Sequence, residues 1–177
     1  PSAQKAQNSA KMDLLMELLP TMVEEGRRIL IFSQFTGMLD LIEKALDKEK
    51  IEYQTLTGKS KDRGKLCDDF QAGKVPVFLI SLRAGGTGIT LTKADTVIHY
   101  DPWWNPALES QATDRAYRIG QKNPVFVYKL ICQGTIEEKI LKLQQKKRAL
   151  FDGILEGAPQ KLEFTENDLE DLLAPIT

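Results

Sequence analysis

The sequence predicts an α/β domain with a central, mainly parallel sheet covered by helices on both faces. Short apolar runs alternate with longer segments of helical spacing along most of the 177-residue chain, which is the pattern of β-α-β units. The apolar runs are almost uninterrupted, as expected for strands buried on both faces. Sheets of this kind bind ligands at the carboxyl ends of their strands, so we expect functional residues in the loops that follow.

Five apolar runs are expected to form the strands because they are short, rich in β-branched residues and bounded by polar or turn-forming positions. They are residues 28–33, 51–57, 75–81, 96–100 and 125–131. The single histidine, His99, lies inside the fourth run and is expected to be a core or strand-end residue rather than a ligand.

Helical spacing of apolar residues predicts helices between and after the strands, over residues 12–25, 36–50, 61–71, 135–151 and 165–173. Pro20 should kink or split the first. A further helix before the fifth strand is expected to be capped by Asn105 and opened by Pro106. We interpret residues 1–10 as a linker, residues 11–151 as the folded domain and residues 152–177 as an acidic helical tail.

Composition excludes several classes of protein. Apolar residues make up 42% and charged residues 28% of the chain, as in ordinary globular domains, and no apolar run approaches the roughly 20 residues of a membrane span. Cys67 and Cys132 lie far apart, so neither a metal site nor a disulfide scaffold is expected. Seven acids and one lysine give residues 152–177 a charge of −6, which leaves +5 on residues 1–151. A mildly basic body permits a polyanionic partner.

Two glycine-containing segments do not support the functions that their motifs suggest. Residues 58–60 (Gly-Lys-Ser) match the end of a P-loop, but Tyr53 stands where that loop requires glycine. Residues 86–88 (Gly-Thr-Gly) lack the third glycine of a dinucleotide-binding turn, and the next strand follows too soon for a crossover helix. A hydride-transfer enzyme is therefore not expected.

Residues 111–121, Gln-Ala-Thr-Asp-Arg-Ala-Tyr-Arg-Ile-Gly-Gln, are the most informative segment. Arg115 and Arg118 are three positions apart in a segment of helical character, so both guanidinium groups should lie on one helical face, with Gly120 ending the helix. Two such cations suit an anion rich in oxygens, such as a nucleotide γ-phosphate or a nucleic-acid backbone. Spacing alone would favour a solvated charged face.

Three loops after strands are further candidates. Residues 32–35 (Phe-Ser-Gln-Phe) follow the first strand, and residues 81–91 form a glycine- and threonine-rich segment after the third. The backbone of such a segment can approach a phosphate closely, although a plain tight turn would have the same composition. Residues 101–106 (Asp-Pro-Trp-Trp-Asn-Pro) follow the fourth strand, and two adjacent tryptophans cannot both point into one core.

In order and spacing, these segments resemble the motifs of Swi/Snf-type ATPases of helicase superfamily 2. Residues 28–35 look like motif IV, and residues 56–58 followed by Arg63 look like the segment after it. Residues 81–91 with 94–95 look like motif V, and residues 101–106 with 111–121 look like the motif VI region. The similarity spans residues 11–150.

The resemblance implies the second of two RecA-like lobes, a three-layer domain of the P-loop NTPase type. ATP and Mg²⁺ would be held mainly by a first lobe of the same polypeptide, whose P-loop and Asp-Glu motif are not in this sequence. The residues implied to face the nucleotide are Arg118 as the arginine finger, Arg115 as second finger or positioner, and Gln111, Gly86 and Gly88. Those implied to track the DNA backbone are Ser33, Gln34, Arg83, Thr87 and Trp104.

The implied function is ATP-dependent translocation on double-stranded DNA, with no turnover by this lobe alone. We expect an intracellular protein without membrane contact, in the cytoplasm or nucleoid if Thr177 is a natural prokaryotic carboxyl terminus and in the nucleus if the source is eukaryotic. A protein partner is expected for the acidic tail. Two alternatives stay open: the matching lobe of an RNA helicase, and a nonenzymatic module that binds DNA or protein.

Overall fold

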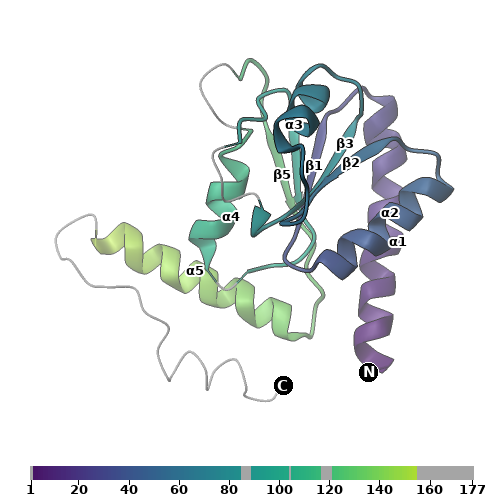
Figure 1. Ribbon diagram of the computed structural model, residues 1–177. Helices are drawn as coiled ribbons and strands as arrows, with labels where there is room; N and C mark the ends of the chain where they lie inside the picture. Colours follow the sequence, from purple (N-terminus) through teal and green to yellow (C-terminus); the bar gives the residue numbers. More distant parts are fainter. Residues whose placement is uncertain (1, 85–88, 104, 117–120, 155–177) are drawn as a thin grey trace.

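Five parallel strands form one sheet in the order β2-β3-β1-β4-β5 (Figure 1). The computed structural model describes residues 2–84, 89–103, 105–116 and 121–154. The strands are β1 Ile29–Ser33, β2 Tyr53–Leu56, β3 Val77–Ser81, β4 Thr96–His99 and β5 Phe126–Lys129. Each predicted strand is present and lies within its predicted run, and the expected parallel sheet is confirmed.

Helices cover both faces of the sheet and make the expected three layers (Figure 1). They are α1 Ser2–Glu24, α2 Thr36–Lys48, α3 Arg63–Gln71, α4 Pro106–Thr113 and α5 Ile136–Ile154. Helices α1 and α2 share one hydrophobic cluster with the sheet, and α3 and α4 share another on the opposite face. Helix α5 follows β5 and contacts α4.

The central strand β1 supplies both clusters because side chains alternate across a strand. Ile29 and Ile31 face the cluster under α1 and α2, whereas Leu30 and Phe32 face the cluster under α3 and α4. All four side chains are fully buried. Burial of each of these side chains stabilises the folded state by about 1.5–3 kcal/mol. A strand buried on both faces therefore carries apolar residues throughout, and its apolar character alone locates it in the sequence.

The structure corrects two expectations about α1. The helix begins at Ser2, so residues 2–10 are helical rather than an irregular linker. The early residues are mostly alanine, glutamine, lysine and serine, and the first three of these favour helix. Pro20 does not split the helix, because the buried side chains of Leu19 and Met22 hold the backbone on both sides of it against the sheet.

The carboxyl-terminal part of the chain differs from expectation in one respect. Helix α5 extends to Ile154, three residues beyond the expected end at residue 151, and the basic residues Lys146, Lys147 and Arg148 lie inside it. The expected helix over residues 165–173 and the rest of the acidic tail lie outside the described residues.

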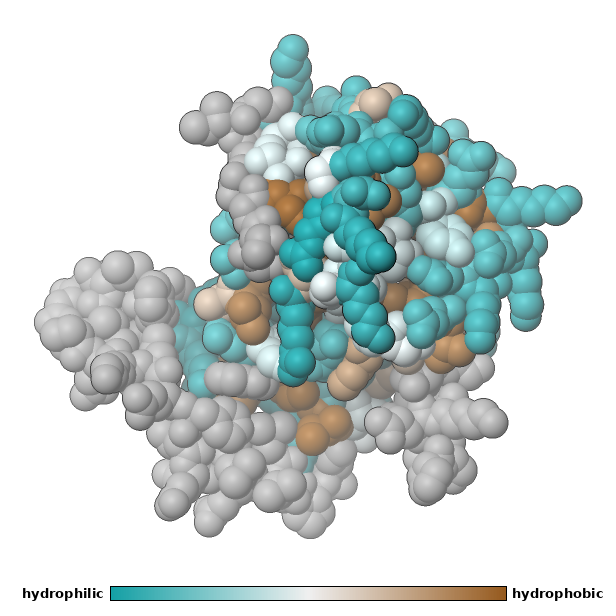
Figure 2. Space-filling model, viewed as in Figure 1, coloured by the Kyte–Doolittle hydropathy of each residue, from teal (hydrophilic) through white to brown (hydrophobic). Residues whose placement is uncertain are grey.

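The face seen in Figure 2 is largely hydrophilic, with hydrophobic side chains in small areas between charged ones. Cys67 and Cys132 do not form a disulfide bond, and both are half-buried. None of the helices in the described ranges is long and apolar enough to cross a membrane. The same residues contain no group of three His, Cys, Asp or Glu side chains that could hold a metal ion.

Candidate functional site

The loops that carry the predicted site residues meet at the carboxyl edge of the sheet because all strands are parallel. In the register of the sheet, Ser33 at the end of β1 lies beside Ser81 at the end of β3, and Phe32 lies beside His99 of β4. The loops after β1, β3 and β4 therefore start side by side. Leu82 N–H donates to the Ser33 carbonyl at 3.0 Å and fastens the second loop to the first.

Ser33 is enclosed, and its hydroxyl is used within the protein. The side chain is fully buried, and its Oγ donates a hydrogen bond to Asp101 Oδ2. The same carboxylate oxygen accepts the Gln34 N–H at 3.1 Å, and Ser33 Oγ accepts the Phe35 N–H at 3.1 Å. Burial raises the pKa of the Asp101 carboxyl, although both hydrogen bonds oppose the shift. Asp101, which was predicted only as part of a candidate loop and without a role, thus joins the loops after β1 and β4.

Gln34 and Arg83 are the described residues of the predicted DNA-facing set that remain accessible. Gln34 is partly exposed beside the Ser33 contact, and Arg83 is exposed in the loop after β3. Ala84 N–H donates to Ser81 Oγ at 3.3 Å and fixes the start of that loop. Of the other predicted residues there, Gly86, Thr87 and Gly88 lie outside the described residues, as does Trp104 after β4.

Helix α4 begins as the sequence predicts. Asn105 Oδ1 accepts the Ala107 N–H at 3.0 Å, and Pro106 occupies the first helical position, where its missing N–H costs nothing. Gln111 lies on this helix with an exposed side chain.

The end of α4 is not as predicted. The helix stops at Thr113, and the N–H groups of Arg115 and Ala116 bond the carbonyls three residues earlier in tight turns. Arg115 therefore lies just beyond the end of α4 and not within it, and whether it shares a face with Arg118 stays a prediction. Arg118 lies outside the described residues.

Arg115 is a buried tie between two segments. Its side chain is only 3% exposed, and Nη1 donates to the Ile89 carbonyl at 3.2 Å. The Arg115 carbonyl accepts the Leu91 N–H at 3.0 Å. These contacts hold the first residue of the arginine run (residues 115–121) against residues 89–91, which end the glycine-rich loop. An arginine with its side chain on the surface would not make the guanidinium contact to Ile89.

A buried polar cluster around Glu109 joins α4 to neighbouring segments. The Glu109 carboxylate is paired with Lys129 Nζ at 2.6 Å and accepts the Trp103 N–H at 2.8 Å and Gln144 Nε2 at 2.9 Å. Burial acts to raise the pKa of Glu109, but the hydrogen bonds from Lys129 and Trp103 outweigh it and lower that pKa. Sequence reasoning missed Glu109; its position three residues before the buried Ala112 was the available signal, since both lie on one helical face.

His99 is a core residue, as predicted. Its ring is 1% exposed and stacks on Phe32 with 5.7 Å between ring centroids, while Nε2 lies 3.0 Å from Thr113 Oγ1. Burial lowers the pKa of His99 from 6.5 to about 4. The imidazole is therefore neutral near pH 7 and does not present a positive charge to a ligand.

Fold and site together define a three-layer parallel α/β lobe in which Arg115 is tied to residues 89–91 at the carboxyl edge of the sheet. Residues 10–120 match the family model described as the helicase conserved C-terminal domain. The chain belongs to this family, and its fold is RecA-like.

Similar proteins identify the Swi/Snf type within the family and confirm the resemblance seen in the motifs. The SNF2 domain-containing protein ENL1 of Oryza sativa subsp. japonica is 44% identical over 169 residues, which cover 94% of this chain and 17% of that protein. The chromatin-remodeling ATPase INO80 of Saccharomyces cerevisiae is 45% identical over 170 residues, covering 92% of this chain and 11% of that protein. The chain thus spans less than a fifth of the length of these relatives.

A solved structure agrees with this placement. The crystal structure of the C-terminal part of the Fun30 ATPase domain superposes with a TM-score of 0.75 at 34% sequence identity, covering 92% of this chain and 51% of that chain. The chain is therefore a helicase C-terminal lobe of the kind found in Swi/Snf-type remodelling ATPases.

Proposed function

We propose that this chain is the second motor lobe of an ATP-dependent translocase acting on double-stranded DNA. The observation that carries the proposal is the tie of Arg115 to Ile89 and Leu91, which fastens the arginine run to the glycine-rich loop at the carboxyl edge of the sheet. Parallel α/β sheets bind their ligands at that edge. ATP as fuel is consistent with relatives such as INO80, which is named a chromatin-remodeling ATPase.

On the nucleotide side, Arg118 is the proposed arginine finger. Arg115 holds the run in place, in the positioning role that the resemblance left open for it. Gln111, Gly86 and Gly88 complete the proposed nucleotide-facing set. Arginine and amide donors at this edge fit phosphate oxygens. Because the P-loop and the Asp-Glu motif are not in this sequence, we assign Mg²⁺ and most of the ATP contacts to a first lobe of the same polypeptide.

Delivery of Arg118 from a second lobe would couple hydrolysis to movement. An arginine finger stabilises the charge that develops in phosphoryl transfer and contributes about 10³–10⁵ in rate. The finger reaches the γ-phosphate only when the two lobes close, so each turnover requires a closing motion. A lobe with a finger but no P-loop is expected to hydrolyse no ATP alone.

On the DNA side, Gln34 and Arg83 are the proposed backbone contacts, together with Thr87 and Trp104. Ser33 is reassigned from direct contact to positioning, because its buried hydroxyl bonds Asp101 and holds the loop that presents Gln34. Contacts to phosphates carry no sequence information, which suits a motor that must move along any sequence. Binding should weaken steeply as salt rises.

The test is the DNA-stimulated ATPase rate of the full two-lobe protein. Arg118→Ala should lower kcat by about 10³ or more while leaving DNA affinity nearly unchanged. The comparison variant Arg83→Ala should weaken DNA binding and reduce its salt dependence without lowering kcat at saturating DNA. Survival of turnover in Arg118→Ala with loss of DNA binding would show that the finger assignment is wrong.

Two further readouts separate the remaining alternatives. Stronger stimulation by RNA than by double-stranded DNA would identify the lobe of an RNA helicase. Magnesium-dependent ATP turnover by this chain alone would contradict the assignment of the P-loop chemistry to a first lobe.

A further inference from the structure

Two glutamine side chains hold the turn at residues 92–94 from different sides. Gln71, the last residue of α3, donates from Nε2 to Thr92 Oγ1 at 3.1 Å and accepts the Lys93 N–H at 2.8 Å. Gln121 donates from Nε2 to the carbonyls of Thr92 at 2.8 Å and Ala94 at 2.6 Å. The turn precedes β4 and continues the segment that Arg115 contacts.

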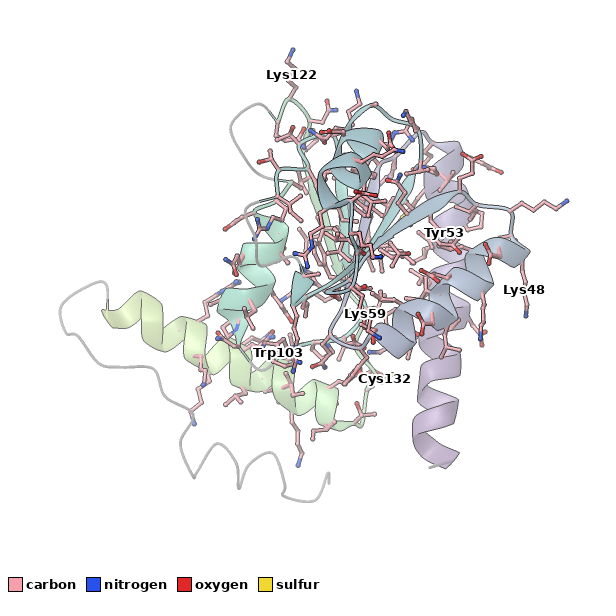
Figure 3. The ribbon with its side chains drawn as sticks, viewed as in Figure 1. Lys48, Tyr53, Lys59, Trp103, Lys122 and Cys132 are labelled. Atoms are coloured by element: carbon pink, nitrogen blue, oxygen red, sulfur yellow. The ribbon has the colours of Figure 1, made fainter. Side chains whose placement is uncertain are left out.

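Gln121 makes two further contacts, and one of them reaches the residues that precede it. Its Nε2 also donates to the Ala116 carbonyl at 3.2 Å, while its Oε1 accepts the Asn123 N–H at 3.0 Å. Residues 116 and 121 are thereby held together, and the short run between them contains Arg118. The neighbouring Lys122 side chain points away from the body of the protein (Figure 3). Gln121, unlike the adjacent Lys122, therefore turns its side chain toward the protein.

Both ends of the arginine run are tied to one continuous segment, residues 89–94. Arg115 bonds Ile89 and Leu91 at the first end, and Gln121 bonds Thr92 and Ala94 at the second. All of these partners on the segment are main-chain groups. The two ties therefore fasten Arg115 and Gln121 to residues 89–94, whatever side chains that segment carries.

We propose that Gln121 is a positioning residue for the arginine finger. Its amide holds the carboxyl end of the arginine run on the 92–94 turn, so that Arg118 is presented in one orientation when the lobes close. The amide nitrogen is engaged by main-chain carbonyls, so Gln121 acts through Arg118 and not on the nucleotide. This inference rests on the proposed function of Arg118.

Gln71 provides a matched control, because Gln71→Ala and Gln121→Ala make the same chemical change and release the same turn. Only Gln121→Ala also releases the arginine run. In the full two-lobe protein, Gln121→Ala should lower DNA-stimulated kcat between about tenfold and about a hundredfold, the cost of a misplaced catalytic group. The KM for ATP and the DNA affinity should stay within about twofold, because binding groups are untouched.

Gln71→Ala should lower Tm about as much as Gln121→Ala does, but it should leave kcat within about twofold of the parent. A second variant, Gln121→Glu, keeps the size of the side chain and the acceptor for Asn123 but removes the donor. It should reproduce the kcat loss, and it supplies the measurement if Gln121→Ala does not fold.

Equal kcat in the Gln121 and Gln71 variants, with Arg118→Ala inactive, would overturn the positioning role and leave the proposed function standing. A Gln121 variant that raises the KM for ATP at unchanged kcat would also overturn it, since that result marks a nucleotide contact. If Arg118→Ala itself keeps its turnover, the proposed function fails and the positioning role fails with it.

Discussion

Glu109 joins three segments to helix α4 through one buried carboxylate. The side chain is 3% exposed and bonds Lys129 of β5, the Trp103 N–H in the loop after β4, and Gln144 of α5. Trp103 lies near the junction of α4 and α5 in Figure 3. We predict that Glu109→Gln destabilises the lobe, because the amide keeps the size of the side chain and loses its charge.

The expected cost follows from the exposure of the two partners. Removing one member of a fully buried ion pair costs about 3–5 kcal/mol. Lys129 is 32% exposed and recovers part of its hydration when the carboxylate is lost. A charge-assisted hydrogen bond contributes about 1.5–3 kcal/mol, so we expect a loss of about 2 kcal/mol. At roughly 2–4 °C per kcal/mol, Tm should fall by about 4–8 °C.

Denaturant unfolding followed by tryptophan fluorescence measures this loss, since both tryptophans of the chain, Trp103 and Trp104, lie in the adjoining loop. Glu138→Gln is the matched control: Glu138 is 39% exposed, pairs with Lys142 at 3.5 Å and accepts the Gly134 N–H at 3.0 Å, a bond that a glutamine oxygen can also accept. The control should change the unfolding free energy by less than about 0.5 kcal/mol.

A double-mutant cycle of Glu109→Gln with Lys129→Met should give a coupling of about 1 kcal/mol or more. The pKa of Glu109 is lowered in the folded state, so its stabilising contribution should be present above the unfolded value near 4.5 and lost as the pH falls through the folded pKa. Equal unfolding free energies for Glu109→Gln and Glu138→Gln, or zero coupling with Lys129, would refute this reasoning.

Two more predictions concern buried ionisable groups. His99 has a folded pKa of about 4 against 6.5 unfolded, so the unfolded state binds the extra proton and stability should decline as the pH falls from 6.5 toward 4, by on the order of 3 kcal/mol. His99→Phe should flatten this dependence in a pH series of unfolding curves; an unchanged slope would show that His99 is not its source. Lys11 is 5% exposed and donates to Glu137 at 2.6 Å and to the Tyr100 carbonyl at 2.9 Å. Lys11→Met should cost about 2–3 kcal/mol and speed amide exchange in α1 more than in β1; unchanged exchange in α1 would rule out this tie.

The sheet could be predicted from the sequence because its strands are buried on both faces. A continuous apolar run such as Ile29–Ser33 has few structural alternatives, and the helices between the runs require parallel strands. Helix ends were less predictable, because they depend on packing as well as on local signals. Helix α1 extends through a polar segment, and α4 stops at Thr113, before the glycine that was expected to end it.

The candidate site was predictable only as a set of loops on one edge of the sheet. Chain order and strand direction bring Ser33, Arg83 and Asp101 to that edge, but they do not show which side chains turn inward. Gln121 and Glu109 take their roles from main-chain groups and side chains distant in sequence. The only local signal was the helical spacing of Glu109 with the buried Ala112, and it did not show which partners Glu109 would contact. Arg115 likewise was expected on a helical face and is instead a buried tie.

The ion pair between Lys11 and Glu137 also defines how the lobe would carry mechanical load. It joins α1, the first described helix, to α5, the last, with 2.5 Å between Nζ and Oε2. The main chain connects the same two helices only through the strands of the sheet, from β1 to β5. The ion pair therefore gives α1 and α5 a direct connection outside the sheet, which would share with the sheet any tension applied across the two helices.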